Sequence, residues 1–214
     1  MKKTILLLCC AALLFIAIAV QNQTGATNAS QNTLASTQLA QPTPATVPHQ
    51  VVRINQLDPA QYASNNEYRS WAYSTCSTAA IAEVLNYYGR HLRIHDVLVV
   101  QARIGEITPA LGLVEDAGIA ATATQFGFKT NWGYNLSYDQ VIAAANHSEP
   151  VIVGWPPQRY DGGHLVVVVG GDSQVVELAD SSRYDRHSLS RAQFMQWWAG
   201  FSAVVTPLAQ GGLS

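Results

Sequence analysis

Three residues that lie far apart in the chain carry side chains that could act together on a carbonyl group. Cys76 stands in "SWAYSTCSTAAIAEVLNYYG", at the start of a predicted helix, where oriented N–H groups and the helix dipole lower the pKa of a thiol. His164 begins a β-branched run after two glycines, and Asp180 ends the next such run. An imidazole near a thiol can form a thiolate–imidazolium pair, and a carboxylate on its other nitrogen fixes its orientation. The three residue types therefore predict nucleophilic thiol chemistry.

Each of these residues also has a purely structural interpretation. A lone cysteine on a helix is often a small buried hydrophobe, a histidine at a strand end often only packs, and an aspartate after a strand is usually a turn residue. Glycines beside His164 leave room for a substrate backbone to approach. The residues alone leave these alternatives open.

The elements that must position these side chains follow from hydrophobic periodicity. An apolar i, i+3, i+4 pattern predicts a helix that starts near Cys76, with Ser74 or Thr75 as N-cap, and ends at Gly89. Short apolar runs and turn residues predict an α+β fold in which His164 and Asp180 lie at the same end of a hairpin around residues 171–173. The other predicted helices are 96–103, 109–117, 137–147 and 190–198, and the predicted strands are 150–154, 164–169, 174–179 and 201–206.

The N-terminus predicts export. Lys2 and Lys3 precede an uncharged apolar run that ends in an A-x-A-like site, which is typical of a signal peptide over residues 1–19. Retention of this run as a membrane anchor is the alternative. Residues 20–50 are polar and carry no Lys, Arg, Asp or Glu up to His49, which predicts a disordered linker, and residues 51–210 have the length of one globular domain. We therefore expect a secreted protein, with cell-surface attachment as the alternative.

The cysteine and charge counts exclude several classes of protein. Cys9 and Cys10 fall inside the predicted signal peptide, so Cys76 has no partner for an intramolecular disulfide. Without Lys2 and Lys3, 10 basic residues stand against 14 acidic ones, a net charge of about −4. No basic stripe of the kind that binds nucleic acid is present. We expect no nucleic-acid partner, no metal and no cofactor, and a monomer that contacts a membrane only through its N-terminal segment.

The motifs in order resemble those of a known family. "TCSTAA" followed by "EVLNYYG" resembles the cysteine helix of the C39-like cysteine peptidases, which belong to the papain-like superfamily. "EPVIVGW", "GGHLVVVVGGDSQVVELADS" and "LSRAQFMQWWAGF" resemble later segments of that family. The resemblance implies a papain-like fold with a cysteine helix packed on an antiparallel sheet. It also implies a Cys76 nucleophile, a His164 acid and base, an orienting Asp180, and a peptide or protein substrate.

One position departs from the family pattern. Papain-like enzymes commonly carry an oxyanion-binding glutamine six residues before the cysteine, and Ser70 stands there in this chain. Ser70, Asn66 or Asn65 are candidate substitutes, beside the backbone N–H of Cys76. Loss of one oxyanion donor typically costs about 10²–10³ in rate. The departure leaves two alternatives to a peptidase: a weak or inactive peptide-binding domain, and an amidase acting on cell-wall peptides.

Overall fold

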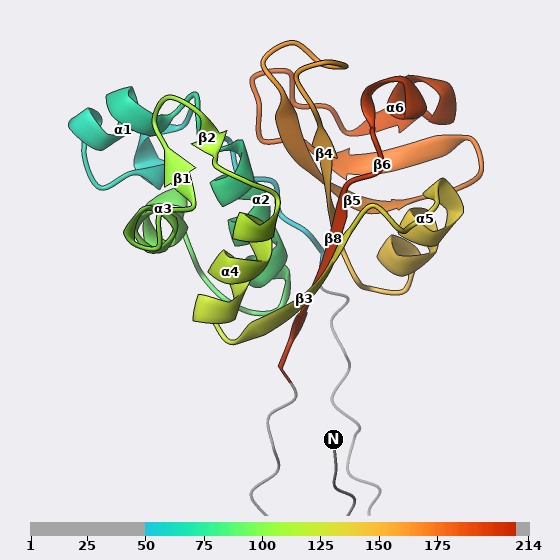
Figure 1. Cartoon of the computed structure of the whole chain (residues 1–214), viewed down its shortest axis with the longest axis horizontal. Helices are drawn as coiled ribbons and strands as arrows, with labels where there is room; N and C mark the ends of the chain where they lie inside the picture. Colours follow the sequence, from blue (N-terminus) through green and yellow to red (C-terminus); the bar gives the residue numbers. More distant parts are fainter. Residues whose placement is uncertain (1–49, 209–214) are drawn as a thin grey trace, which may run out of the picture. The chain divides into compact units, whose positions relative to one another are not determined.

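The computed structural model describes residues 50–208, which form a helical part and an antiparallel sheet side by side (Figure 1). The predicted signal peptide and almost all of the predicted linker lie outside the described residues. Within residues 50–208, none of the helices has the length and apolar character needed to cross a bilayer.

The helical part precedes most of the sheet in the chain. After a short 3₁₀ turn, four helices surround a two-stranded hairpin, and two further helices pack on the sheet. The helical elements are η1 (Pro59–Gln61), α1 (Asn65–Trp71), α2 (Cys76–Tyr87), α3 (Ile94–Arg103), α4 (Ala117–Gln125), α5 (Tyr138–Asn146) and α6 (Arg191–Trp197).

The sheet has six strands in the order β3-β8-β4-β5-β6-β7, and every neighbouring pair is antiparallel. The β5–β6 pair forms the predicted hairpin. The strands are β3 (Phe128–Gly133), β4 (Val151–Trp155), β5 (His164–Gly171), β6 (Val175–Ala179), β7 (Ser188–Ser190) and β8 (Ser202–Pro207), while β1 (Ile107–Thr108) and β2 (Gly112–Leu113) pair separately.

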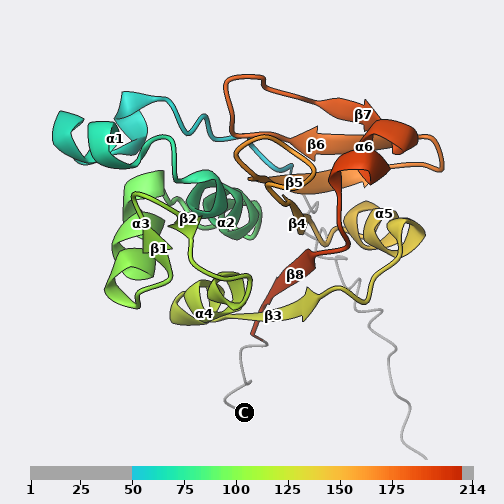
Figure 2. The same ribbon diagram turned by 45° about the horizontal axis from the view of Figure 1, so that its top comes forward.

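Alternation along the strands gives the sheet two buried faces. On β4, Ile152 faces the core shared with α2, α3 and α4, while Val151 and Val153 face a second core shared with α5 and α6. On β5, Val167 faces the first core and its neighbours face the second. Figure 2 shows α2 on one side of the sheet and α5 and α6 on the other. This is the predicted α+β fold, with the cysteine helix packed against an antiparallel sheet.

Local signals located several helix starts correctly. Ser137 and Gln140 form a reciprocal capping box at α5, in which the N–H of Ser137 donates to Oε1 of Gln140 at 2.8 Å. At α6 only half of a capping box forms: Ser190 Oγ accepts from the N–H of Gln193, while Nε2 of Gln193 donates to Oε1 of Gln196. The helix of residues 96–103 begins slightly earlier, at Ile94.

The predicted helix of residues 109–117 is wrong. Thr108 Oγ1 accepts from the N–H of Leu111 as an N-cap would, but the chain turns into the β1–β2 hairpin. Gly112 has a positive φ of 69°, and a Cβ there would lie 3.0 Å from the carbonyl oxygen of Ser74. Because this backbone passes so close to the loop before α2, position 112 requires glycine, and its positive φ is incompatible with a continuing helix. The next helix, α4, begins only at Ala117.

Candidate active site

Cys76 is the first residue of α2, as the sequence predicts. Thr75 occupies the N-cap position, but its side chain makes no cap; its hydroxyl lies 2.8 Å from the hydroxyl of Tyr62. The backbone carbonyl of Thr75 accepts from Ala79 N–H and so starts the helix. The Cys76 thiol is thus held at the N-terminal end of a helix whose next residues are all buried.

His164 is the first residue of β5 and pairs with Trp155 of β4. Its ring lies against Trp155 and Tyr160, with centroid separations of 5.8 and 6.1 Å, and it is 7% exposed. The preceding glycines have positive φ values, and a Cβ on Gly163 would lie 3.1 Å from the ring of Pro157. These glycines therefore form the tight turn that brings the histidine ring to its place.

Asp180 follows β6 and is completely buried. Its Oδ1 lies 2.8 Å from Nε2 of His164 and accepts from the N–H of Ser182, while Oδ2 accepts from the Arg186 guanidinium at 2.9 Å. The His164 imidazole is also hydrogen-bonded to the Cys76 thiol. Because Nε2 of the ring faces Asp180, Nδ1 is the nitrogen that remains for this bond to the thiol. The structure brings the three predicted side chains together in one chain of contacts.

The electrostatics of the three groups favour charge separation. Burial raises the pKa of the Cys76 thiol, but the hydrogen bond and charge of His164 and the N–H groups of Leu165 and Ser77 outweigh burial and bring that pKa below its ordinary value. Burial lowers the pKa of His164, yet Asp180 and Cys76 raise it to about 9. The pKa of Asp180 falls well below its usual range, because the bonds from His164 and Ser182 outweigh burial. The three shifts together favour a thiolate, an imidazolium and a carboxylate over the neutral forms.

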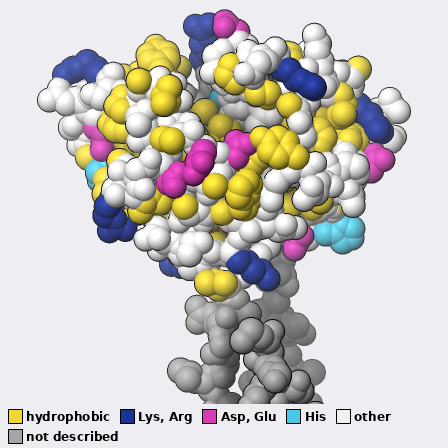
Figure 3. Space-filling model, in the orientation of Figure 1, with side chains coloured by type: hydrophobic (Ala, Val, Ile, Leu, Met, Phe, Trp, Pro, Cys, Tyr) yellow, Lys and Arg dark blue, Asp and Glu magenta, His cyan; other side chains and the backbone are white. Residues whose placement is uncertain are grey.

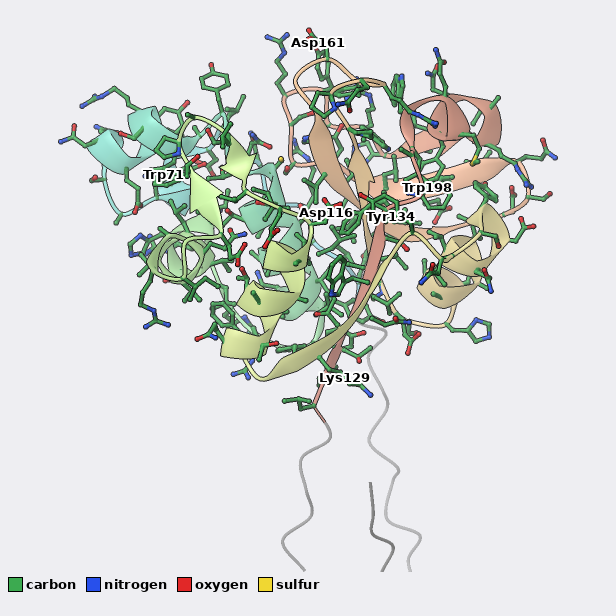
Figure 4. All side chains as sticks on the ribbon, in the orientation of Figure 1. Trp71, Asp116, Lys129, Tyr134, Asp161 and Trp198 are labelled. Carbon is green, nitrogen blue, oxygen red and sulfur yellow. The ribbon has the colours of Figure 1, made fainter. Side chains whose placement is uncertain are left out.

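A cleft of about 400 Å³ opens over Cys76 and His164. One wall comes from the segment between β1 and α4 and the other from the sheet side, and Figure 3 shows acidic and apolar side chains together at the centre of this face. In Figure 4, Asp116 and Tyr134 lie side by side there. The Tyr134 hydroxyl donates to the Asp116 carboxylate, and this bond is the main cause of a rise in the pKa of Tyr134 to about 12. Besides Cys76 and His164, the lining includes Gln56, Tyr73, Leu111, Glu115, Asp116, Tyr134, Trp155, Pro157, Gly163 and Phe201.

Comparison with known protein families shows which family the chain belongs to. The model of the Peptidase C39-like family matches residues 48–205, which include nearly all of the described residues. The chain belongs to the Peptidase C39-like family. No curated protein sequence matches this C39-like chain.

Two of the solved structures that match illustrate the fold of this C39-like chain. The peptidase domain of Streptococcus ComA, a bifunctional ABC transporter involved in quorum sensing, is 19% identical, with a TM-score of 0.57 over 74% of this chain and 100% of that one. A protein from Bacillus anthracis described as a C39-like peptidase is 14% identical, with a TM-score of 0.53 over 74% and 95% of the two chains. The α+β, papain-like fold is confirmed by these likenesses.

The structure does not bring Ser70 or Asn66, the expected oxyanion donors, to the cleft of this C39-like chain. Both residues lie exposed in α1, and neither lines the cleft. The Asn66 side chain accepts a hydrogen bond from Arg69 instead. The position six residues before Cys76 does not supply the donor in this chain, because it lies in α1 and no residue of α1 lines the cleft.

A glutamine does line the cleft, at a position that the sequence analysis missed. Gln56 lies 20 residues before the cysteine and is buried. Its Nε2 donates to the carbonyl of Ala72 at 2.9 Å, and its Oε1 accepts from the Ser181 hydroxyl at 2.9 Å. An amide nitrogen has two protons, so Nε2 carries a second donor beyond the one used by Ala72. No spacing rule signals this residue, because its place depends on contacts with Ser181, 125 residues away.

The charge separation predicts an unusual pH dependence for alkylation of Cys76. We expect iodoacetamide to modify the thiol at lower pH than an ordinary cysteine, because protonated His164 favours the thiolate. In His164→Ala, burial acts without the imidazolium, so the pKa of the thiol rises and alkylation at about pH 6 slows by roughly 10–100-fold. Stopped-flow or mass-spectrometric alkylation rates across pH test this. Identical profiles for the wild type and the variant would contradict the assigned ion pair.

Proposed function

We propose that this C39-like chain is a cysteine peptidase that hydrolyses peptide bonds through Cys76, His164 and Asp180. The observation that carries the proposal is the continuous contact from the Cys76 thiol through the His164 ring to the Asp180 carboxylate at 2.8 Å, at the base of a cleft. Membership in the Peptidase C39-like family supports the same conclusion.

In the proposed acylation step, the Cys76 thiolate attacks the carbonyl carbon of the scissile bond and forms a C–S bond. The carbonyl electron pair moves to oxygen, and the oxyanion accepts hydrogen bonds from Nε2 of Gln56 and the backbone N–H of Cys76. The His164 imidazolium then donates its Nδ1 proton to the nitrogen of the leaving amine as the C–N bond breaks. The product is a thioester on Cys76 and a free amine.

In the proposed deacylation step, neutral His164 accepts a proton from water, whose oxygen attacks the thioester carbonyl. The C–S bond breaks, the carboxylic product leaves, and the thiolate–imidazolium pair is restored. Asp180 stays ionised throughout and holds the His164 ring, because Arg186 and the N–H of Ser182 occupy its remaining acceptor positions.

The proposed peptidase acts outside the cell that makes it. The apolar N-terminal run and the polar segment after it support this, with attachment through that run as the alternative. Fractionation of a producing culture tests it: we expect the shortened chain in the medium, whereas a full-length chain in the cytosolic fraction would contradict export.

The glutamine in the cleft bears on the inactive alternative. That alternative was motivated by the serine at position 70, and Gln56 offers an amide donor at the cleft itself. Incubation of the purified protein with a peptide library at neutral pH, followed by mass spectrometry of new termini, tests the proposal. Cleaved peptides support a peptidase, cleavage of purified peptidoglycan alone supports the amidase, and binding without new termini would overturn the proposal.

The charge of the cleft predicts a substrate preference. Glu115 and Asp116 line it, and none of its lining residues in the described part of the chain is a lysine or an arginine. We expect peptides with a Lys or Arg near the scissile bond to be cleaved faster than neutral analogues, and the difference to shrink at high salt.

Removal of one of these carboxylates tests the preference. Glu115→Gln should lower kcat/KM for a basic peptide by about two- to fivefold and leave a neutral peptide unchanged, since exposed charge pairs contribute little each. Glu149→Gln, an exposed carboxylate outside the lining of the cleft, is the matched control and should change neither. Equal effects on both peptides would argue against the preference.

A further inference from the structure

The helix that carries Cys76 contains a fully buried carboxyl group. Glu83 lies seven residues after Cys76 in α2, among Ala80, Val84 and Leu85, and is completely buried with them. Burial raises the pKa of this carboxyl to about 8, so it is largely neutral at pH 7. A carboxyl group in an apolar core is costly even when neutral, which calls for a role that a leucine could not fill.

The contact that Glu83 makes is to a single backbone group. Its Oε1 accepts from the N–H of Ile54 at 2.7 Å, and its Oε2 has no hydrogen-bond partner among the described residues. The charged groups around it are Arg53, Asp180 and His164. Glu83 therefore connects α2, which we call the nucleophile helix because it begins with Cys76, to the part of the chain just before Gln56.

We define the bridging segment as residues 53–56. Figure 2 shows the N-terminal end of the described chain, in blue, running between α1 and the sheet. On the sheet side, Arg53 donates to the carbonyls of Asp180 and Ser182 at 2.5 and 2.6 Å. The N–H of Gln56 donates to the carbonyl of Ser181 at 2.9 Å. The segment is thus bonded to three consecutive residues that begin with the orienting aspartate.

On the helix side, the bridging segment has two anchors. One is the bond from the backbone N–H of Ile54 to the Glu83 carboxyl group. The other is the bond from the side-chain amide of Gln56 to the carbonyl of Ala72, four residues before Cys76. The backbone N–H groups of Ile54 and Gln56 therefore bond to opposite sides, one to the nucleophile helix and one to the strand end that holds Asp180. The segment sets the spacing between these two parts and carries the oxyanion donor.

We propose that Glu83 is a positioning residue, which fixes the bridging segment on the nucleophile helix so that Gln56 stays aligned with Cys76 and His164. The catalytic consequence of this inference rests on the proposed function. The attachment of the bridging segment to the nucleophile helix is a property of the fold and does not depend on that function. A carbonyl-type acceptor at Oε1 is what the role requires, and a negative charge is not.

Three variants separate this role from simple core packing. Glu83→Gln keeps an acceptor oxygen at the same place and should retain near wild-type kcat. Glu83→Leu leaves Ile54 N–H unpaired and should lower kcat by about 10–100-fold, with KM changed by less than about threefold, because an oxyanion donor acts mainly in the transition state. Val84→Ala, a neighbouring core change that removes no hydrogen bond to the segment, should lower the unfolding temperature but keep kcat.

Two further measurements identify the path of the effect. Iodoacetamide alkylation of Cys76 should stay at the wild-type rate in Glu83→Leu, since it needs the thiolate but not the oxyanion donor. In the double variant with Gln56→Ala, the loss should not exceed that of Gln56→Ala alone. Additive losses, wild-type kcat in Glu83→Leu, or an equal loss in Glu83→Gln would overturn the proposal.

Hydrogen exchange tests whether Glu83 holds the bridging segment in place, even if no substrate is cleaved. The amides of Ile54 and Gln56 should exchange at least about tenfold faster in Glu83→Leu than in Val84→Ala at matched stability, and near the wild-type rate in Glu83→Gln. Unchanged protection in Glu83→Leu would overturn the proposal whatever the activity. Absence of cleavage by the wild type, with the predicted exchange pattern intact, would instead contradict the proposed peptidase function alone.

Discussion

Replacement of Cys76 by alanine lowers peptide hydrolysis by at least about 10⁴-fold, because no other residue among 50–208 carries a thiol that could form the thioester. The described residues contain Cys76 as their free cysteine, at the helix start and in contact with His164. Initial rates on a peptide cleaved by the wild type provide the measurement. His164→Ala should show a similar loss, and the double variant should be no slower than either single one, since the two residues act as a unit.

The matched control for this prediction is a change at a buried site on the same helix that leaves the thiol in place. Ala82→Gly should reduce stability and leave the rate per folded molecule near that of the wild type. Cleavage by Cys76→Ala at more than about one hundredth of the wild-type rate would remove the cysteine from the mechanism.

Replacement of Gln56 by alanine should lower kcat by about 10²–10³-fold with little change in KM, which is the usual loss for one oxyanion donor. Ser70→Ala and Asn66→Ala should have no effect, because both side chains are exposed in α1 and outside the cleft. The same steady-state assay compares all three variants. Rates of Cys76 alkylation should be unchanged in Gln56→Ala, which separates an oxyanion role from a change in the thiol.

The opposite pattern would restore the original expectation. A loss in Ser70→Ala or Asn66→Ala, with Gln56→Ala at the wild-type rate, would mean that α1 moves onto the cleft when substrate binds. Because the Gln56 side chain also bonds Ala72 and Ser181, its variant must be shown to be folded by circular dichroism and thermal unfolding.

Much of the fold follows from local sequence signals. The α2 periodicity, the serine caps of α5 and α6 and the hairpin between β5 and β6 all act over a few residues, and the structure confirms these elements. The contact between His164 and Asp180 followed from the strand order and one short turn, which is why it could be predicted. The assignment of Cys76 to the start of α2 depended on the same short-range logic.

The errors in the sequence predictions have long-range causes. The helix predicted at 109–117 is a hairpin because Gly112 passes against the backbone of Ser74, a contact between segments nearly 40 residues apart. Gln56 was missed because its side chain is placed by Ser181, far along the chain. Glu83 fits the buried face of an apolar helix by position alone, and only the fold shows that it reaches Ile54.

The most direct test of the central claim is mass spectrometry of the acid-quenched reaction between the protein and a cleaved peptide, since a thioester on Cys76 is the one species that the proposed mechanism requires. We predict a mass increase equal to the acyl part of the substrate on the fragment that contains Cys76, formed in the wild type, accumulating when deacylation is slowed and absent in Cys76→Ser. Steady turnover with no adduct on Cys76, in a protein whose Cys76→Ser variant remains active, would contradict the account.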